Sequence, residues 1–159
     1  CELAGGAHSA DAYHITAPHP QGDGAARVMT EALKDAGMTP ADVDYVNVHG
    51  TSTLPGDKCE LIAVGKVFGD DAYRINISST KSMTGHLLGA TGALEAIACV
   101  KSIEQGVVPP TINHFTDDPD IDPKLNLTFN AAQHRKVRAA MSNTFGFGGH
   151  NGTLVFREI

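Results

Sequence analysis

Helix-like and strand-like segments alternate along the 159 residues of this chain, without an internal repeat or a low-complexity linker. Apolar residues recur at helical spacing in three segments, 25–36, 58–68 and 89–105. Short runs rich in β-branched residues predict four strands, at 43–48, 75–79, 137–143 and 152–157. The order α-β-α-β-α-β-β predicts a layered α/β domain.

The composition is that of an ordinary globular protein, with 42% hydrophobic and 19% charged residues. A chain of this length can form one domain that buries roughly two-thirds of its surface. The formal net charge of −6 argues against a nucleic-acid partner, which requires a basic face. We interpret the one basic cluster, at 133–138, as a solvated edge that an acidic partner could use.

No apolar run approaches the roughly 20 residues of a membrane span, and no charged-then-apolar leader opens the sequence. We therefore expect a cytoplasmic protein with no membrane partner. The three cysteines, Cys1, Cys59 and Cys99, lie at no metal-ligand spacing, which predicts neither a disulfide framework nor a zinc site. Because the chain begins within apolar sequence and without methionine, we expect a fragment of a longer protein.

The loops that follow three of the predicted strands carry the most reactive residues. In α/β sheets, ligands bind beyond the carboxyl ends of the strands. The first loop carries His49 with the hydroxyls of Thr51 and Thr53, the second carries Lys81 and His86, and the third is the glycine-rich "SNTFGFGGHNG". A lone histidine is commonly structural, but two imidazoles and a lysine at one edge favour a functional site.

Other functional classes have weaker support in the sequence. "GFGGHNG" contains Gly-x-Gly but precedes a strand, so no helix N-terminus follows it to bind a phosphate. The Gly-x-Ser-x-Gly elbow of a serine hydrolase is missing. The remaining histidines have no spacing that places two metal ligands on one helical face, and we expect them to face solvent: His8, His14, His19, His114, His134 and His150.

Four motifs resemble those of the β-ketoacyl-acyl carrier protein synthases, the decarboxylating condensing enzymes of the thiolase-like fold: "DAYHITAPHPQGDGA", "HGTSTLPGD", "STKSMTGHLLGATGALEA" and "SNTFGFGGHNG". The residues of these motifs look more like those of the elongating synthases of bacterial type II fatty-acid synthesis than like those of modular polyketide synthases. The resemblance runs through essentially all 159 residues and covers the second half of the family's chain. It implies that 1–159 form the C-terminal half of a thiolase-like fold, a mixed sheet with helices on both faces.

The resemblance implies a decarboxylating condensation in fatty-acid elongation. The family loads an acyl chain onto a cysteine and attacks that thioester with a carbanion made from malonyl carrier protein. His49 and His86 match its histidines, whose Nε2–H donors stabilise the developing enolate. Lys81 matches a lysine that supports the site electrostatically, and Thr51 and Thr53 match hydroxyls that bind the pantetheine arm.

Further residues are assigned a role only through this resemblance. Phe147 matches a phenylalanine that gates the acyl pocket and whose backbone N–H serves the oxyanion hole, with Phe145 nearby and flexible glycines on both sides. No cofactor is required. Four residues match positions that hold either a structural monovalent or divalent cation or an equivalent hydrogen-bond network: Asn47, Glu95, Ser142 and Asn151. Glu95 is equally a candidate partner for Lys81.

The family's nucleophilic cysteine has no counterpart in this sequence. In the family it lies in the first half of the chain, at a strand-to-helix turn where the helix N-terminus lowers its pKa. Cys59 and Cys99 are instead expected inside helices as small core side chains, and Cys1 opens the chain. We therefore expect an acyltransferase that is inactive alone and supplies only the His/His/Lys part of the site.

The resemblance also implies partners. These are malonyl- and acyl-loaded acyl carrier protein, the N-terminal half of the synthase and, for the intact enzyme, a second copy in a homodimer. The alternative is a non-catalytic thiolase-like fragment or subunit that binds a carrier-protein arm or a partner chain. The small residues at the start of the helix predicted at 89–105 suit close packing against such a partner.

Overall fold

The structure, a computed structural model, describes residues 1–159 and is built around one five-stranded mixed sheet in the order β1-β7-β6-β2-β3. β2 pairs in parallel with both β3 and β6, whereas β7 pairs antiparallel with β6 and β1. The strands are β1 (Glu2–Ala10), β2 (Tyr45–Asn47), β3 (Asn76–Ser78), β6 (Ala139–Gly146) and β7 (His150–Arg157). The carboxyl ends of β2, β3 and β6 therefore meet at one edge.

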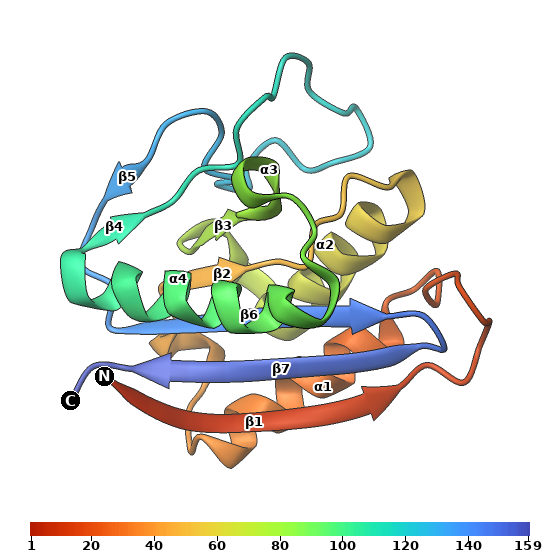
Figure 1. The fold of residues 1–159 in the computed structure, drawn as a ribbon, viewed down its shortest axis with the longest axis horizontal. Helices are drawn as coiled ribbons and strands as arrows, with labels where there is room; N and C mark the ends of the chain where they lie inside the picture. The colour runs from red at the N-terminus through yellow and green to blue at the C-terminus, as the bar shows by residue number, and fades with distance from the viewer.

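Helices cover both faces of this sheet, as the resemblance implies. Figure 1 shows α4 in front of the sheet and α1 and α2 behind it. The helices are α1 (Asp23–Asp35), α2 (Leu54–Phe68), the single turn α3 (Lys81–Thr84) and α4 (Thr91–Gln105). Short 3-10 turns and a small separate ladder complete the chain: η1 (Pro40–Asp42), η2 (Gly69–Tyr73), η3 (Leu88–Ala90), β4 (Val107–Val108) and β5 (Gln133–His134).

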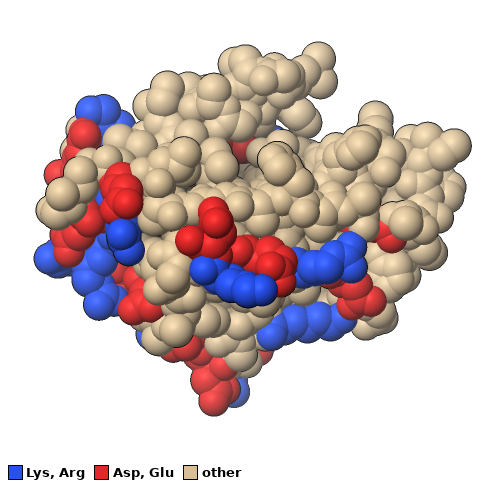
Figure 2. Space-filling model, turned by 90° about the horizontal axis from the view of Figure 1, so that it is seen from below, with Lys and Arg blue, Asp and Glu red and all other residues tan.

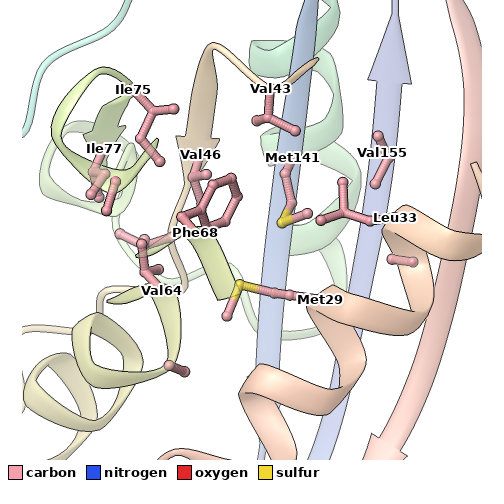
Figure 3. Close-up of a cluster of buried hydrophobic side chains, with 14 of the residues drawn as sticks. Met29, Leu33, Val43, Val46, Val64, Phe68, Ile75, Ile77, Met141 and Val155 are labelled. Atoms are coloured by element: carbon pink, nitrogen blue, oxygen red, sulfur yellow. The ribbon is translucent and has the colours of Figure 1, made fainter. Parts of the chain in front are cut away.

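The larger hydrophobic core lies between the sheet and the helices α1 and α2. In Figure 3, Met29 and Leu33 of α1 lie toward Met141 and Val155 of the sheet, and Phe68 of α2 lies close to Val46. The 3.6-residue spacing of apolar positions in α1 produces this buried face. A smaller core on the opposite side of the sheet packs α4 against β2, β6 and β7, and consists of Tyr45, Cys99, Val108, Val137, Ala140 and Phe156.

The first strand is not expected from the sequence. No strand is predicted before residue 25, yet β1 pairs with β7 from Glu2↔Arg157 to Ala10↔His150. Two adjacent glycines weaken the local strand signal of β1, so its pairing with a distant segment decides its structure. The second helix starts at Leu54 rather than at 58, because Pro55 suits the first turn of a helix.

The basic cluster at 133–138 is not simply a solvated edge. Arg138 donates from its Nε and a terminal nitrogen to the buried carboxylate of Asp44, at 3.1 Å each, and Arg135 approaches the same carboxylate at 3.3 Å. Figure 2 shows basic and acidic side chains intermingled on the face that it views. None of the helices combines the length and apolar character needed to span a bilayer.

Candidate active site

His49, His86 and Phe145 lie together at the carboxyl edge of the parallel strands. His49 follows β2, and its ring centroid lies 5.5 Å from that of His86, with the two ring planes at 88°. The ring of Phe145, near the end of β6, lies 5.7 Å from the His49 ring. Residues separated by up to 96 positions thus share one site because β2 pairs in parallel with β6.

The hydrogen bonds of His86 determine which ring nitrogen carries its proton. Its Nδ1 accepts a hydrogen bond from the backbone N–H of Leu88 at 3.1 Å, and the hydroxyl of Thr91 lies at 3.1 Å from the same nitrogen. Since a nitrogen that accepts from an amide cannot carry a proton, a neutral His86 holds its proton on Nε2. His86 therefore presents a donor.

His49 is a neutral imidazole. Burial, together with the positive charge of Lys81 and the neighbouring His86, lowers the pKa of His49 to about 3. Its Nδ1 is buried without a hydrogen-bond partner. An unpaired buried N–H would be costly, which favours the tautomer with the proton on Nε2. Both histidines can then act as hydrogen-bond donors without carrying charge.

Lys81 is a buried lysine paired with a buried glutamate. Its Nζ donates to Oε1 of Glu95, and the two side chains are 4% and 2% exposed. Burial raises the pKa of Glu95, while the ion pair with Lys81 opposes that rise. Lys81 opens α3, directly after β3, and Glu95 lies on α4. The pair therefore fixes the segment that carries His86 against the helix that follows it.

Hydroxyl groups and a cavity lie beside the histidines. The Oγ1 atoms of Thr51 and Thr53 lie 3.1 Å apart on the loop before α2. The carboxylate of Asp57 accepts a hydrogen bond from the N–H of Ser52 at 3.2 Å and so braces this loop. A cavity of about 870 Å³ is lined by both threonines, by Lys81 and His86, and by part of the loop 111–129.

The glycine-rich motif, expected to be a loop, is mostly strand: it continues β6 as far as Gly146 and starts β7 at His150, so that only 147–149 form the turn. Phe147 lies at its tip and is 78% exposed, whereas Phe145 is packed within β6. The N–H of Gly148 donates to the Ile15 carbonyl at 2.6 Å, and the Gly149 carbonyl accepts from the N–H of Asp11 at 2.9 Å. The fourth motif, at 11–25, thus lies directly against the turn that carries Phe147.

The four residues of the candidate cation set do not lie together. Asn47 and Ser142 are register partners on the face of the sheet that α4 covers, and Glu95 projects from α4. Oδ1 of Asn47 and Oε2 of Glu95 are both buried without a partner, and such oxygens fit a hard cation. Asn151 lies on the opposite face, where its Nδ2 donates to Asp11 at 2.7 Å.

No group of three or more His, Cys, Asp or Glu side chains could hold a metal ion. Of the remaining histidines, His114 is not simply solvent-facing, since its ring stacks on that of Phe129 at 3.6 Å. Cys59 and Cys99 are buried, as expected from their helical positions, and burial raises the pKa of both thiols. A thiol with a raised pKa is a poor nucleophile at neutral pH.

Sequence reasoning misses one buried residue beside the site, Glu60 of α2. It is 3% exposed, and its carboxylate accepts hydrogen bonds from the backbone of the His49 loop. One sequence signal could have found it. Glu60 lies three and four positions before Ala63 and Val64, so it is a charged residue on the apolar side of the helix.

A helix-covered mixed sheet with a pair of imidazoles at its carboxyl edge is typical of the thiolase-like fold, and the predicted fold class is confirmed. The chain matches the family described as "Beta-ketoacyl synthase, C-terminal domain" over residues 1–115, and it belongs to that family.

Among curated relatives, this chain is 52% identical over 158 residues to the 3-oxoacyl-[acyl-carrier-protein] synthase 2 of Staphylococcus aureus (strain COL), covering 99% of this chain and 38% of that protein. It is 52% identical over the same length to Nodulation protein E of Rhizobium meliloti, with the same coverage of both chains. The chain thus spans 38% of the length of these relatives.

Solved structures give the same result for the fold. The ketosynthase of a type II polyketide system, solved as "AntDE:AntF (apo): type II PKS acyl-carrier protein in complex with its ketosynthase bound to the hexaketide", superposes with a TM-score of 0.94 at 39% identity, covering 99% of this chain and 38% of that one. A β-ketoacyl synthase from Burkholderia phymatum STM815 gives 0.90 at 39% identity, covering 98% and 37%.

Proposed function

We propose that this chain supplies the decarboxylating part of a condensing active site in fatty-acid elongation, acting on malonyl-acyl carrier protein. The observation that carries this proposal is the pair of imidazoles whose ring centroids lie 5.5 Å apart, and in each of which the surroundings of Nδ1 leave Nε2 as the nitrogen free to donate. Two neighbouring donors of this kind suit an oxygen on which negative charge develops during reaction.

In the proposed reaction, the bond between the malonyl α-carbon and its carboxylate breaks and CO2 leaves. The electron pair of that bond moves into the thioester, whose oxygen becomes an enolate oxygen. His49 and His86 donate Nε2–H hydrogen bonds to this oxygen. The enolate carbon then attacks an acyl thioester on a cysteine supplied by a segment outside this chain, and the cysteine thiolate leaves.

The other residues of the site hold and orient the substrate in this proposal. The adjacent hydroxyls of Thr51 and Thr53, at the wall of the cavity, suit the amide groups of a pantetheine arm. Phe147, exposed on a turn with left-handed glycines at 148 and 149, gates the acyl pocket. Lys81, held by Glu95, adds its positive charge to the effect of burial, and together they keep His49 neutral.

The proposed partners are acyl carrier protein, the N-terminal half of the synthase and a second copy of the complete protein. The names of the Staphylococcus relative and of the polyketide ketosynthase complex both include an acyl carrier protein, which supports the first of these. A structural cation is proposed at the unpaired oxygens of Asn47 and Glu95, with Ser142 beside Asn47. Because Lys81 already balances the charge of Glu95, the cation would only satisfy these two unpaired oxygens and would take no part in the reaction.

His49→Ala and His86→Ala in the full-length protein test the proposal. Each change removes one donor to the enolate oxygen, and removal of one such donor typically lowers kcat by about 100- to 1000-fold. We expect release of CO2 from malonyl carrier protein to fall by this factor in each variant. Acylation of the separate cysteine by acyl carrier protein should continue, since it needs no enolate.

His134→Ala is the matched control, because His134 is exposed on β5 and is not one of the residues assigned to the site. It should leave both reactions unchanged. Full-length wild-type protein that binds a carrier-protein arm but releases no CO2 would reject the proposal in favour of a non-catalytic subunit.

A further inference from the structure

His86 lies on an exposed loop, and a buried hydroxyl group contacts its ring. Residues 83–90, which lead from the end of α3 to the start of α4, are all exposed. Figure 1 shows this loop running from α3 to α4. Thr91, the first residue of α4, is 1% exposed, and its Oγ1 lies 3.1 Å from Nδ1 of His86. The contact therefore joins an imidazole on a loop to the packed part of the domain.

The hydroxyl of Thr91 has His86 as its only hydrogen-bond partner. Other helical hydroxyls in this chain donate to the carbonyl four residues earlier, as Thr30 does at 2.9 Å and Ser102 does at 2.8 Å. Thr91 forms no such bond, and at 1% exposure it does not have solvent as an alternative. Since a buried hydroxyl without a partner is costly, the bond to His86 is the one that allows Thr91 to be buried here.

The direction of this hydrogen bond follows from the other contact of the same nitrogen. Nδ1 of His86 accepts from the N–H of Leu88 at 3.1 Å, so in the neutral ring it carries no proton and can only accept. The hydroxyl of Thr91 must then donate. In the other tautomer, the Nδ1–H of His86 would face the amide N–H of Leu88, donor against donor. Both contacts therefore favour the proton on Nε2.

The two donors to Nδ1 differ in how firmly they are held. Leu88 is 79% exposed, adopts a φ of +52° and belongs to the same loop as His86, so its amide does not by itself fix the ring relative to the sheet. Thr91 belongs to α4, which the buried ion pair of Glu95 with Lys81 holds against the end of β3. Of the two donors, Thr91 is thus the one that fixes the imidazole relative to the rest of the site.

We infer that Thr91 is a positioning residue for the proposed decarboxylation, donating its hydroxyl hydrogen to Nδ1 of His86 and so holding the ring with its Nε2–H toward the enolate oxygen. This inference rests on the proposed function and extends it to a residue that touches no substrate. Thr91 acts only through His86, which donates to an oxygen that becomes negative during the reaction. Its substitution should therefore change kcat more than KM.

Two substitutions separate the hydrogen bond from simple packing. Valine has nearly the shape of threonine but no hydroxyl, so Thr91→Val keeps the packing and removes the donor. Serine keeps the hydroxyl and lacks the methyl group, so Thr91→Ser removes packing and keeps the donor. If Thr91 only filled space at the start of α4, the serine variant would be the more damaged of the two. The inference predicts the opposite order.

The test is the rate of CO2 release from malonyl carrier protein by the full-length wild type and these two variants. We expect Thr91→Val to lower kcat by about 3- to 10-fold, the usual worth of one hydrogen bond, with little change in KM. Thr91→Ser should stay close to wild type. Thr30→Val is the matched control, because this hydroxyl is exposed on α1 and donates to the Ala26 carbonyl, and it should leave the rate unchanged. A Thr91→Val variant with wild-type kcat, or a Thr91→Ser variant as slow as Thr91→Val, would overturn the inference.

Nuclear magnetic resonance provides a readout that does not depend on activity. In full-length protein labelled with ¹⁵N-histidine, the Nδ1 resonance of His86 is identified by its loss in His86→Ala. Because a hydrogen bond to an unprotonated ring nitrogen lowers its chemical shift, this resonance should move to a higher shift in Thr91→Val and stay in place in Thr91→Ser. A resonance that does not move in Thr91→Val would overturn the inference. A resonance that moves, in a protein whose wild type releases no CO2, would support the contact and reject the proposed function.

Discussion

At the scale of single residues, different interactions determine the hydrogen-bonding state of the two imidazoles of the candidate site. His86 is set by direct hydrogen bonds, since the Leu88 N–H and the Thr91 hydroxyl both meet its Nδ1. His49 is set by its surroundings, since burial and the charge of Lys81 keep it neutral. Burial is the larger of these two effects, and the charge of Lys81, which the ion pair with Glu95 holds in place, adds to it.

Lys81→Met tests this dependence. The substitution leaves the buried carboxylate of Glu95 without its partner, and loss of one member of a buried ion pair typically costs about 3–5 kcal/mol of folding stability. The double variant Lys81→Met/Glu95→Leu removes both charges and should recover most of that loss. Urea denaturation of the full-length proteins measures both effects.

Measuring the decarboxylation rate distinguishes a structural role of the Lys81–Glu95 pair from a chemical one. The rate should remain low in the double variant even though stability returns, because the positive charge beside the histidines is gone. A double variant that is less stable than Lys81→Met would contradict the assignment of Glu95 as the partner of Lys81.

At the scale of elements, the turn between β6 and β7 is where backbone conformation limits the sequence most strictly. Gly148 and Gly149 have φ values of +84° and +73°, a region that L-residues with side chains rarely adopt. A Cβ on Gly149 would lie 3.0 Å from the Cβ of Asp11, whose N–H holds the same turn. The turn is therefore restricted both by its own φ angles and by the loop packed against it.

Gly149→Ala should lower the free energy of unfolding by about 1–2 kcal/mol, the usual cost of a left-handed conformation for an L-residue. Under the proposed function it should also slow acylation of the separate cysteine, since the turn carries Phe147. Gly65→Ala is the control, because this helical glycine has open space around it and alanine should stabilise α2 by up to about 1 kcal/mol. Equal stabilities for the two variants would contradict the strain argument.

At the scale of the whole molecule, the face formed by α4 and the segment before it is apolar and uncovered. Met83, Leu88 and Ile97 are 44%, 79% and 55% exposed. Figure 1 places α4 on the outside of the sheet, with no element of this chain in front of it. Exposed apolar residues gathered on one face are typical of a surface that packs against a partner.

The chain produced alone should therefore associate or bind an apolar dye such as anilinonaphthalene sulfonate. Ile97→Lys places a charge in the middle of this face and should reduce both dye binding and association, whereas Val100→Lys, on the half-buried side of α4, should instead destabilise the fold. Size-exclusion chromatography with light scattering measures association. A monomer with no dye binding above that of a typical globular protein would contradict the expectation.

Much of the fold and the main site residues could be predicted because their signals are local. The helical spacing of apolar residues in 25–36 and the β-branched run at 43–48 correspond to α1 and β2, and helix and strand preferences act over a few residues. The motifs around His49, Lys81 and His86 are also short contiguous segments, so they can be recognised in the sequence.

What the sequence by itself determined is thus the α/β class and the candidate residues of the site. The tertiary structure alone decided which of them meet. Asn151 lies on the other face from Ser142 because the register sets Ser142 opposite Leu154, and a shift of one residue exchanges the faces. β1 forms because it pairs with β7. The amide that donates to Glu60 belongs to a loop ten residues earlier in the chain. Each of these contacts depends on strand register and helix packing, which no local run of residues encodes.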